Sequence, residues 1–118
     1  MNKKEARLRR SKKTRLKIKE LGIDYLVVYK SCRHIYAQIL SGTHRGKVIT
    51  SASSKSKEIV DKINNGANML AASLVGQLLA QKALAVGVEN IAFDRSGFKY
   101  HGSVKKLAQS ARDNGLKF

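Results

Sequence analysis

The sequence predicts an α/β domain with one mixed β-sheet, packed helices and a basic arm at its N-terminus. Three patterns support this: β-branched and aromatic runs between residues 25 and 52, apolar residues at helical spacing over 67–87 and 104–111, and a dense cationic start. The 118 residues, 42% of them hydrophobic, suffice for the core of one domain. We therefore expect an arm over residues 1–22 and a single globular domain over residues 23–118.

The arm holds half of the net positive charge of the chain. Residues 1–20 contain ten basic and two acidic side chains, and the net charge of the whole chain is +16. The few apolar residues of the arm form no continuous stripe, so we expect a segment with helical propensity and no core contact that becomes ordered on a polyanion. A merely solubilising tail is the alternative. The cations expected to contact the polyanion are Lys3, Lys4, Arg7, Arg9, Arg10, Lys12, Lys13 and Arg15.

Three short strands are expected to form an antiparallel meander. Residues 25–29, Tyr-Leu-Val-Val-Tyr, are typical of a strand that is buried on both faces. Residues 34–40 alternate, with an apolar side chain at every second position and polar or aromatic side chains between them. A loop bounded by two glycines then leads to a third strand over residues 47–52.

Two further helices and one further strand are expected to complete the sheet and cover it. A short helix over residues 55–63 precedes a long amphipathic helix, for which residues 64–66 are plausible caps and Gly87 is the end. A right-handed crossover then places a strand over residues 89–93 parallel to the third strand. A last helix ends at Gly115. The apolar positions of the long helix are Ala67, Leu70, Ala71, Leu74, Val75 and Leu78, and those of the last helix are Val104, Leu107, Ala108 and Ala111.

The polar face of the second strand is the first candidate for nucleic-acid contact. It carries rings and an amide, and two cations lie at the preceding turn. Rings stack on unpaired bases while Lys and Arg hold phosphates, so this mixture suits RNA. The alternative is the solvated face of a half-buried strand. The residues concerned are Lys30, Arg33, His34, Tyr36 and Gln38.

The second candidate is the polar loop over residues 93–102, which leads to the N-terminus of a helix, where phosphate is favoured. The spacing of its glycines is not that of a nucleotide-binding P-loop. The alternative is a structured turn in which Asp94 pairs with Arg95 or caps a backbone group, and we expect Asp94 to be structural. The candidate contact residues are Arg95, Lys99, Tyr100 and His101.

Other function classes are not favoured. The acidic residues outside the arm do not gather as a metal-dependent nuclease requires, so we expect no catalytic residue, no metal and no cofactor. The single cysteine, Cys32, fits a reducing compartment, and neither a secretory signal nor a membrane-spanning run is visible. We therefore expect a cytoplasmic protein with no membrane partner and no small-molecule substrate. A nonspecific DNA-binding protein stays open as an alternative on charge alone.

Two motifs and the C-terminus resemble those of a known family. Residues 33–38 (Arg-His-Ile-Tyr-Ala-Gln), 93–102 (Phe-Asp-Arg-Ser-Gly-Phe-Lys-Tyr-His-Gly) and 111–118 (Ala-Arg-Asp-Asn-Gly-Leu-Lys-Phe) are similar to the bacterial form of ribosomal protein eighteen of the large subunit. The resemblance implies a ribonuclease-H-like fold and a structural, non-enzymatic role in the ribosome. It also implies binding to 5S rRNA and its attachment to the large-subunit rRNA in the central protuberance, beside ribosomal protein five of the large subunit.

The resemblance also assigns roles to the candidate residues. It implies that the arm cations contact rRNA phosphates and that the four loop residues form a second contact region. It assigns to the 5S rRNA surface the residues Arg33, His34, Tyr36 and Gln38. Two positions depart from the family pattern, since Cys32 stands where Asn is usual and Ser103 where Arg is common. Each departure removes one polar or charged contact.

Overall fold

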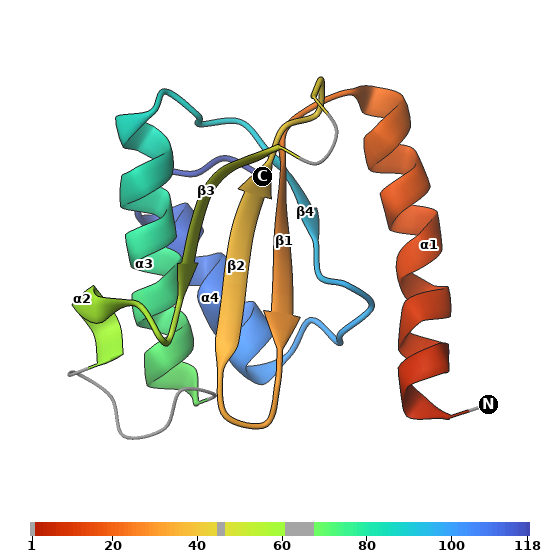
Figure 1. The fold of residues 1–118 in the computed structure, drawn as a ribbon, viewed down its shortest axis with the longest axis horizontal. Helices are drawn as coiled ribbons and strands as arrows, with labels where there is room; N and C mark the ends of the chain where they lie inside the picture. Colours follow the sequence, from red (N-terminus) through yellow and green to blue (C-terminus); the bar gives the residue numbers. More distant parts are fainter. Residues whose placement is uncertain (1, 45–46, 61–67) are drawn as a thin grey trace.

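One four-stranded mixed sheet forms the centre of the molecule. The structure is a computed structural model that describes residues 2–44, 47–60 and 68–118. The strands are β1 (Tyr25–Lys30), β2 (Ile35–Leu40), β3 (Val48–Ser53) and β4 (Ala92–Asp94), in the order β3-β2-β1-β4. The two hairpin pairs are antiparallel and β1 pairs with β4 in parallel, which confirms the α/β class and the mixed sheet (Figure 1). The expected crossover strand is present, but β4 lies parallel to β1 and not beside β3.

Two of the four helices that the structure describes, α3 (Met69–Ala85) and α4 (Gly102–Asp113), cover one face of this sheet. The other two are α1 (Lys3–Leu21) and α2 (Lys57–Val60). Figure 1 shows α3 and α4 together on one side of the strands, while α1 lies beside the β4 edge. Helices α3 and α4 approach closely at Gly76, where an added Cβ would overlap the backbone carbonyl oxygen of Leu107. Among the described residues, none of the helices combines the length and the apolar character that a membrane span requires.

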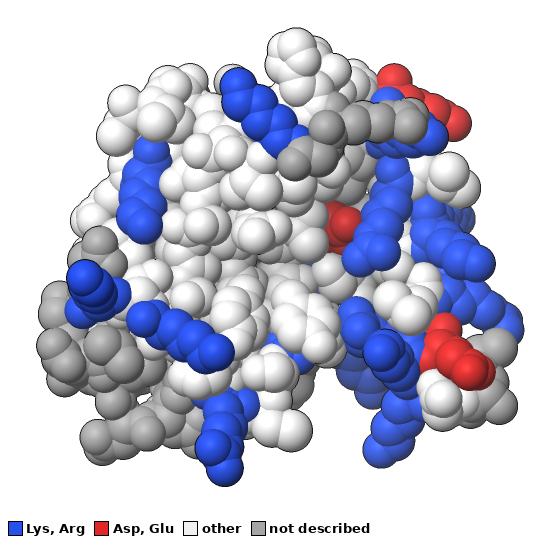
Figure 2. Space-filling view, viewed as in Figure 1, with Lys and Arg blue, Asp and Glu red and all other residues white. Residues whose placement is uncertain are grey.

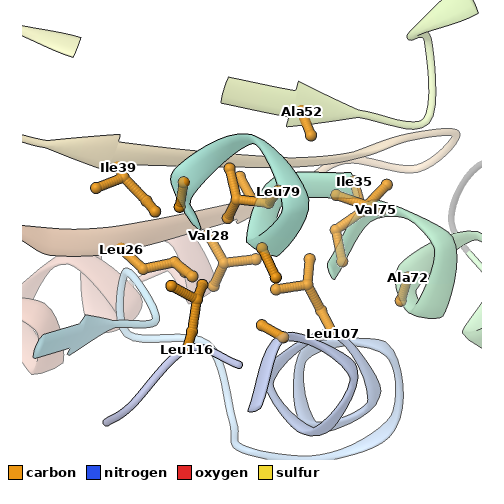
Figure 3. Close-up of a cluster of buried hydrophobic side chains, with 14 of the residues drawn as sticks. Leu26, Val28, Ile35, Ile39, Ala52, Ala72, Val75, Leu79, Leu107 and Leu116 are labelled. Atoms are coloured by element: carbon orange, nitrogen blue, oxygen red, sulfur yellow. The ribbon is translucent and has the colours of Figure 1, made fainter. Parts of the chain in front are cut away.

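The hydrophobic core lies between the sheet and helices α3 and α4. Leu26, Val28, Ile35 and Ile39 point from β1 and β2 toward Leu79 of α3 and Leu107 of α4, and all six are fully buried (Figure 3). The alternation predicted for residues 34–40 and the buried face predicted for the last helix are both confirmed. Burial of each of these six side chains stabilises the folded state by about 1.5–3 kcal/mol relative to leaving that side chain in water.

Two predicted faces need correction. Strand β1 is buried on one face only, because Leu26 and Val28 are buried while Val27 is half-buried and Tyr29 is exposed. In α3, Leu70 is 57% exposed, and the buried face comprises Ala71, Ala72, Val75, Gly76, Leu79, Ala80 and Ala83. This helix is apolar around most of its circumference, so the spacing of its apolar residues does not determine which side faces the core.

The N-terminal cap of α3 differs from the one expected, whereas its C-terminal glycine is the expected one. Residues 61–67, which include the expected caps, lie outside the described residues. Asn68 instead caps α3, since its side-chain oxygen accepts a hydrogen bond of 2.8 Å from the backbone N–H of Ala71. At the other end, α3 stops at Ala85, and Gly87 follows with a φ of 86° that a glycine adopts without strain.

The N-terminal segment is a docked helix and not an arm without core contact. Asn2 caps α1 by accepting a 2.8 Å hydrogen bond from the N–H of Glu5, and Gly22 ends the helix with a φ of 66°. Ser11 and Ile18 of α1 are buried, at 2% and 6% exposure. The expectation of no core contact is therefore wrong, because one side of this cationic helix packs against the domain.

Candidate nucleic-acid interface

The face of the sheet opposite α3 and α4 carries a continuous row of rings. The row runs His34, Tyr36, Tyr29, Phe98, with successive ring centroids 6.2, 6.2 and 5.9 Å apart. Tyr29 and Tyr36 are direct cross-strand partners of β1 and β2, so the antiparallel register brings their rings together. We call His34, Tyr36, Tyr29 and Phe98 the aromatic row.

Cations lie over both halves of the aromatic row. The Lys55 ammonium lies 5.9 Å from the ring centre of Tyr36. The Arg7 guanidinium of α1 lies 4.4 Å from the ring centre of Phe98 and 5.7 Å from that of Tyr29. A guanidinium over a ring is a favourable contact of about 0.5–1 kcal/mol at such exposed sites. The face therefore offers flat apolar surfaces next to positive charge, which is the combination that binds bases and phosphates together.

His34 is held in place at one end of the row. Its Nδ1 lies 2.8 Å from the hydroxyl oxygen of Ser54, a fully buried residue whose hydroxyl also accepts a 3.3 Å hydrogen bond from the N–H of Ile35. Arg33, at the turn before β2, and Gln38, on β2, are exposed. The predicted polar face of the second strand is thus present, with His34 the most constrained of its side chains.

Three arginines of α1 point toward the domain and bond to the end of β4 and to the loop that follows it. Arg7 donates to the carbonyl oxygen of Ser96 at 2.8 Å, Arg10 to that of Gly97 at 3.2 Å, and Arg15 to a carboxylate oxygen of Asp94 at 3.0 Å. The backbones meet so closely that a Cβ at Gly97 would overlap the carbonyl oxygen of Arg7. Part of the cationic charge of the helix therefore fixes its position on the domain.

Asp94 is the buried anchor of this docking. The residue is 2% exposed; one carboxylate oxygen accepts the N–H of Ser96 at 2.8 Å and the other accepts from Arg15. The structural role expected for Asp94 agrees with this geometry, including the capping of a backbone N–H. Its ionic partner is Arg15, brought in by α1, and not the neighbouring Arg95.

The loop residues and α1 meet around a cavity. Arg10, Arg95, Lys99 and Tyr100 line a cavity of about 320 Å³ between α1 and the loop. The hydroxyl of Tyr100 accepts a 3.1 Å hydrogen bond from Arg112, which fixes that ring. His101 is the N-cap residue of α4 and is exposed, with no side-chain hydrogen bond to the helix end. Docking thus joins part of the arm to the second predicted contact region.

The comparisons with known proteins identify the family. The family described as "Ribosomal L18 of archaea, bacteria, mitoch. and chloroplast" matches the chain over residues 1–118. The chain belongs to this family. Similar proteins include the "Large ribosomal subunit protein uL18" of Ralstonia pickettii (strain 12J), 54% identical over 121 residues, and that of Azoarcus sp. (strain BH72), 51% identical over 118 residues. Both alignments cover 100% of this chain and of the relative, and the uL18 of Coxiella burnetii (strain RSA 493 / Nine Mile phase I) is 48% identical over 118 residues.

Membership of the L18 family confirms the resemblance that the motifs predicted. The chain is a ribosomal protein of the large subunit, located in the ribosome, and the family is one of structural proteins and not of enzymes. Within the described ranges, no three His, Cys, Asp or Glu side chains converge where a metal ion could bind. The exposed Cys32 lies in the turn between β1 and β2.

The sequence patterns do not reveal Tyr29, Lys55 and Phe98 as parts of this surface. The run over residues 25–29 predicts burial on both faces, although Tyr29 lies two residues beyond Val27 and so shares the side of the partly exposed positions. Phe98 and Lys55 lie far from the second strand in sequence, and only the folded chain brings them to the row. The strand register could have revealed Tyr29, but no local sequence pattern reveals Lys55 or Phe98.

Charge is distributed unevenly over this face of the L18-family chain. Figure 2 shows Lys and Arg gathered over α1 and spaced around the remaining margin, with uncharged surface over the strands between them. RNA presents phosphates along its backbone and uncharged rings at its bases. The face therefore has positions for phosphates at its edges and for bases or riboses at its centre.

Proposed function

We propose that the chain binds 5S rRNA through the open face of its sheet, its N-terminal helix and the loop after β4. In this proposal it helps to attach 5S rRNA to the large-subunit rRNA in the central protuberance, with ribosomal protein five of the large subunit as a neighbour. Family membership supports the setting. The observation that carries the binding surface is the aromatic row, with cations over its rings and at its margins.

The sheet surface is proposed to hold 5S rRNA by ring contacts and by nearby cations. His34, Tyr36 and Gln38 present rings and an amide to the RNA, while Lys30 and Arg33 contact phosphates from the adjoining turn. The loop residues Arg95, Lys99, Tyr100 and His101 form the second contact region, and the cavity that three of them line with Arg10 is a place for a phosphate.

The arm is proposed to contribute charge in two ways. Lys3, Lys4, Lys12 and Lys13 are exposed and are suited to phosphates along an RNA strand, as is Arg9. Arg7, Arg10 and Arg15 have a second, structural role, because they also hold α1 against β4 and the loop that follows it. Residues 1–22 remain the RNA-binding arm and residues 23–118 the globular domain in this proposal, with the arm acting as a positioned helix.

A competition gel shift tests the proposal. Labelled 5S rRNA is bound near physiological salt, and unlabelled 5S rRNA, tRNA and duplex DNA compete for the protein. We expect 5S rRNA to compete best. We also expect log K to fall, for each neutralised phosphate, by about 0.7–0.9 per unit increase in log[salt]. Equal competition by all three would reject specific 5S recognition and favour a nonspecific nucleic-acid binder.

A matched pair of substitutions tests the row itself. Tyr36→Leu removes the ring and Tyr36→Phe keeps it, and both retain an apolar side chain on the half-buried strand. We expect Tyr36→Leu to weaken 5S rRNA binding by about 1–3 kcal/mol, the usual contribution of a stacked base, and Tyr36→Phe to stay within about 0.5 kcal/mol of the wild type. Equal affinities for the two variants would show that the ring makes no stacking contact.

A further inference from the structure

A cavity separates α1 from the open face of the sheet, at the other end of β1 from the aromatic row. It encloses about 660 Å³ and is lined by α1, by β1 and β2 and by the loop after β2. Ile18 of α1, Val27 of β1 and Leu40 of β2 form apolar walls. The volume lies within the range of about 300–1,000 Å³ that is typical of sites for small organic groups.

The rim of this cavity is cationic, and the negative charge of the carboxylate at its floor is neutralised. Arg15 and Lys19 line it from α1. Asp94, the one acid among the described residues that line it, has both carboxylate oxygens engaged, one by the N–H of Ser96 and the other by Arg15. An occupant that complements these walls and this rim has a flat, uncharged part inside and a negative charge at the entrance.

A hydroxyl in the cavity has a proton to donate. Ser41 Oγ accepts the N–H groups of Thr43 at 3.3 Å and of His44 at 3.0 Å. Both of its lone pairs are then used, so in its 3.2 Å contact with Thr43 Oγ1 the serine hydroxyl is the donor. The proton of the Thr43 hydroxyl is therefore left for an acceptor such as a carbonyl oxygen or ring nitrogen of a base.

We propose that this cavity receives one unstacked nucleotide of the bound RNA. The base enters between Ile18 and Val27 and accepts a hydrogen bond from Thr43, while its phosphate lies at Lys19 and at the outer edge of Arg15. Extruding one nucleotide costs a few kcal/mol in a duplex and less in a loop or bulge, so the nucleotide comes from an unpaired part of the RNA. The inference rests on the proposed RNA-binding function and adds to it a pocket that reads a single base.

Filling the cavity tests the inference. Val27→Phe places a ring in the space. Val86→Phe is the matched control, because Val86 is 58% exposed at the end of α3, which covers the other face of the sheet, and it does not line the cavity. We expect Val27→Phe to weaken 5S rRNA binding about 5- to 100-fold, the equivalent of removing one stacked base, and Val86→Phe to bind as the wild type does. Base-specific chemical probes (dimethyl sulfate for A and C, a carbodiimide for G and U) should find one unpaired base protected by the wild type and exposed with Val27→Phe.

A second pair of variants serves if Val27→Phe does not fold. Thr43 is exposed at the cavity edge, so its substitution leaves the core untouched. Thr43→Val should weaken binding about 2- to 10-fold by removing a donor, and Thr43→Ser should restore it. The inference is overturned if a folded Val27→Phe protein binds and protects 5S rRNA as Val86→Phe does. If Val27→Phe does not fold, equal binding by the two Thr43 variants overturns it. Absence of 5S binding by the wild type would instead reject the proposed function.

Discussion

Docking of α1 requires a residue without a Cβ at position 97, where Gly97 stands, and one substitution can test this. Gly97 has a φ of 77°, and an added Cβ would overlap the backbone carbonyl oxygen of Arg7 in α1. Gly97→Ala therefore forces the helix away from the loop. Gly87→Ala is the matched control, because Gly87 has a similar φ of 86° and open space where its Cβ would stand.

The two variants share one cost and differ in another. The left-handed conformation costs a residue with a Cβ about 1–2 kcal/mol, and both variants bear that cost. Only Gly97→Ala also disrupts the docking of α1, which comprises three arginine hydrogen bonds and the burial of Ile18. At about 0.5–1 kcal/mol for each partly exposed polar contact and about 1.5–3 kcal/mol for the isoleucine, less the entropy of holding long side chains, docking is worth about 2–4 kcal/mol.

Urea unfolding and hydrogen exchange together measure this difference. We expect the free energy of unfolding to be about 2–4 kcal/mol lower for Gly97→Ala than for Gly87→Ala, with a smaller m-value because less surface remains to be exposed. The backbone amides of α1 should exchange rapidly in Gly97→Ala and stay protected in Gly87→Ala. Equal stabilities within about 0.5 kcal/mol, with α1 equally protected in both, would refute the docking argument.

Three other predictions concern stability. Asp94→Ala leaves the N–H of Ser96 without its acceptor and should lower the free energy of unfolding by about 2–4 kcal/mol, whereas Asp94→Asn keeps that acceptor and should cost less, as urea titration will show. Gly76→Ala should cost about 1–3 kcal/mol in the same assay, since its Cβ would overlap a carbonyl of α4. The hydrogen bond from Lys117 to Glu89, and then the charge of Glu89, raise the pKa of Lys117 above 10.5. The stabilisation by this pair is therefore full from neutral pH up to about pH 10.5 and is lost as pH rises through the folded-state pKa. The stability difference between wild type and Glu89→Gln should therefore be constant near neutral pH and shrink above pH 10.5; a difference that is unchanged there would contradict this.

The sequence predicted those parts of the fold that repeat a simple local pattern. Residues 34–40 alternate strictly, and the last helix has one narrow apolar stripe, so in each the buried face follows from the spacing alone. The position of β4 did not follow, because the direction of a crossover strand leaves open which parallel strand it joins. That choice depends on how the whole sheet closes, and no residue within β4 encodes it.

The candidate site was predicted only in part for a related reason. Strand β1 reads as apolar on both faces because Val27 lines a cavity whose opposite wall is Ile18 of α1. No sequence pattern predicts that wall, since the residues that hold α1 in place bond to backbone carbonyls or a carboxylate 79 to 89 positions away in sequence. An arginine that bonds to a distant carbonyl leaves no periodic signal, so charge alone indicated a free arm.

The docked position of α1 changes how its charge must be tested. A 19-residue segment that folded only on RNA would spend about 1–2 kcal/mol per residue on ordering its backbone, whereas α1 is already helical and placed beside the sheet. Deleting it would remove phosphate contacts, one wall of the cavity and the partner of Asp94 together, so a weaker affinity would have no single cause. Lys12→Gln and Lys13→Gln neutralise exposed charges without touching the docking contacts. Each should reduce the salt dependence of log K by about 0.7–0.9 for every phosphate that the lysine neutralises in the wild type, while α1 amides stay protected, and this isolates the electrostatic part of binding from the part that shape provides.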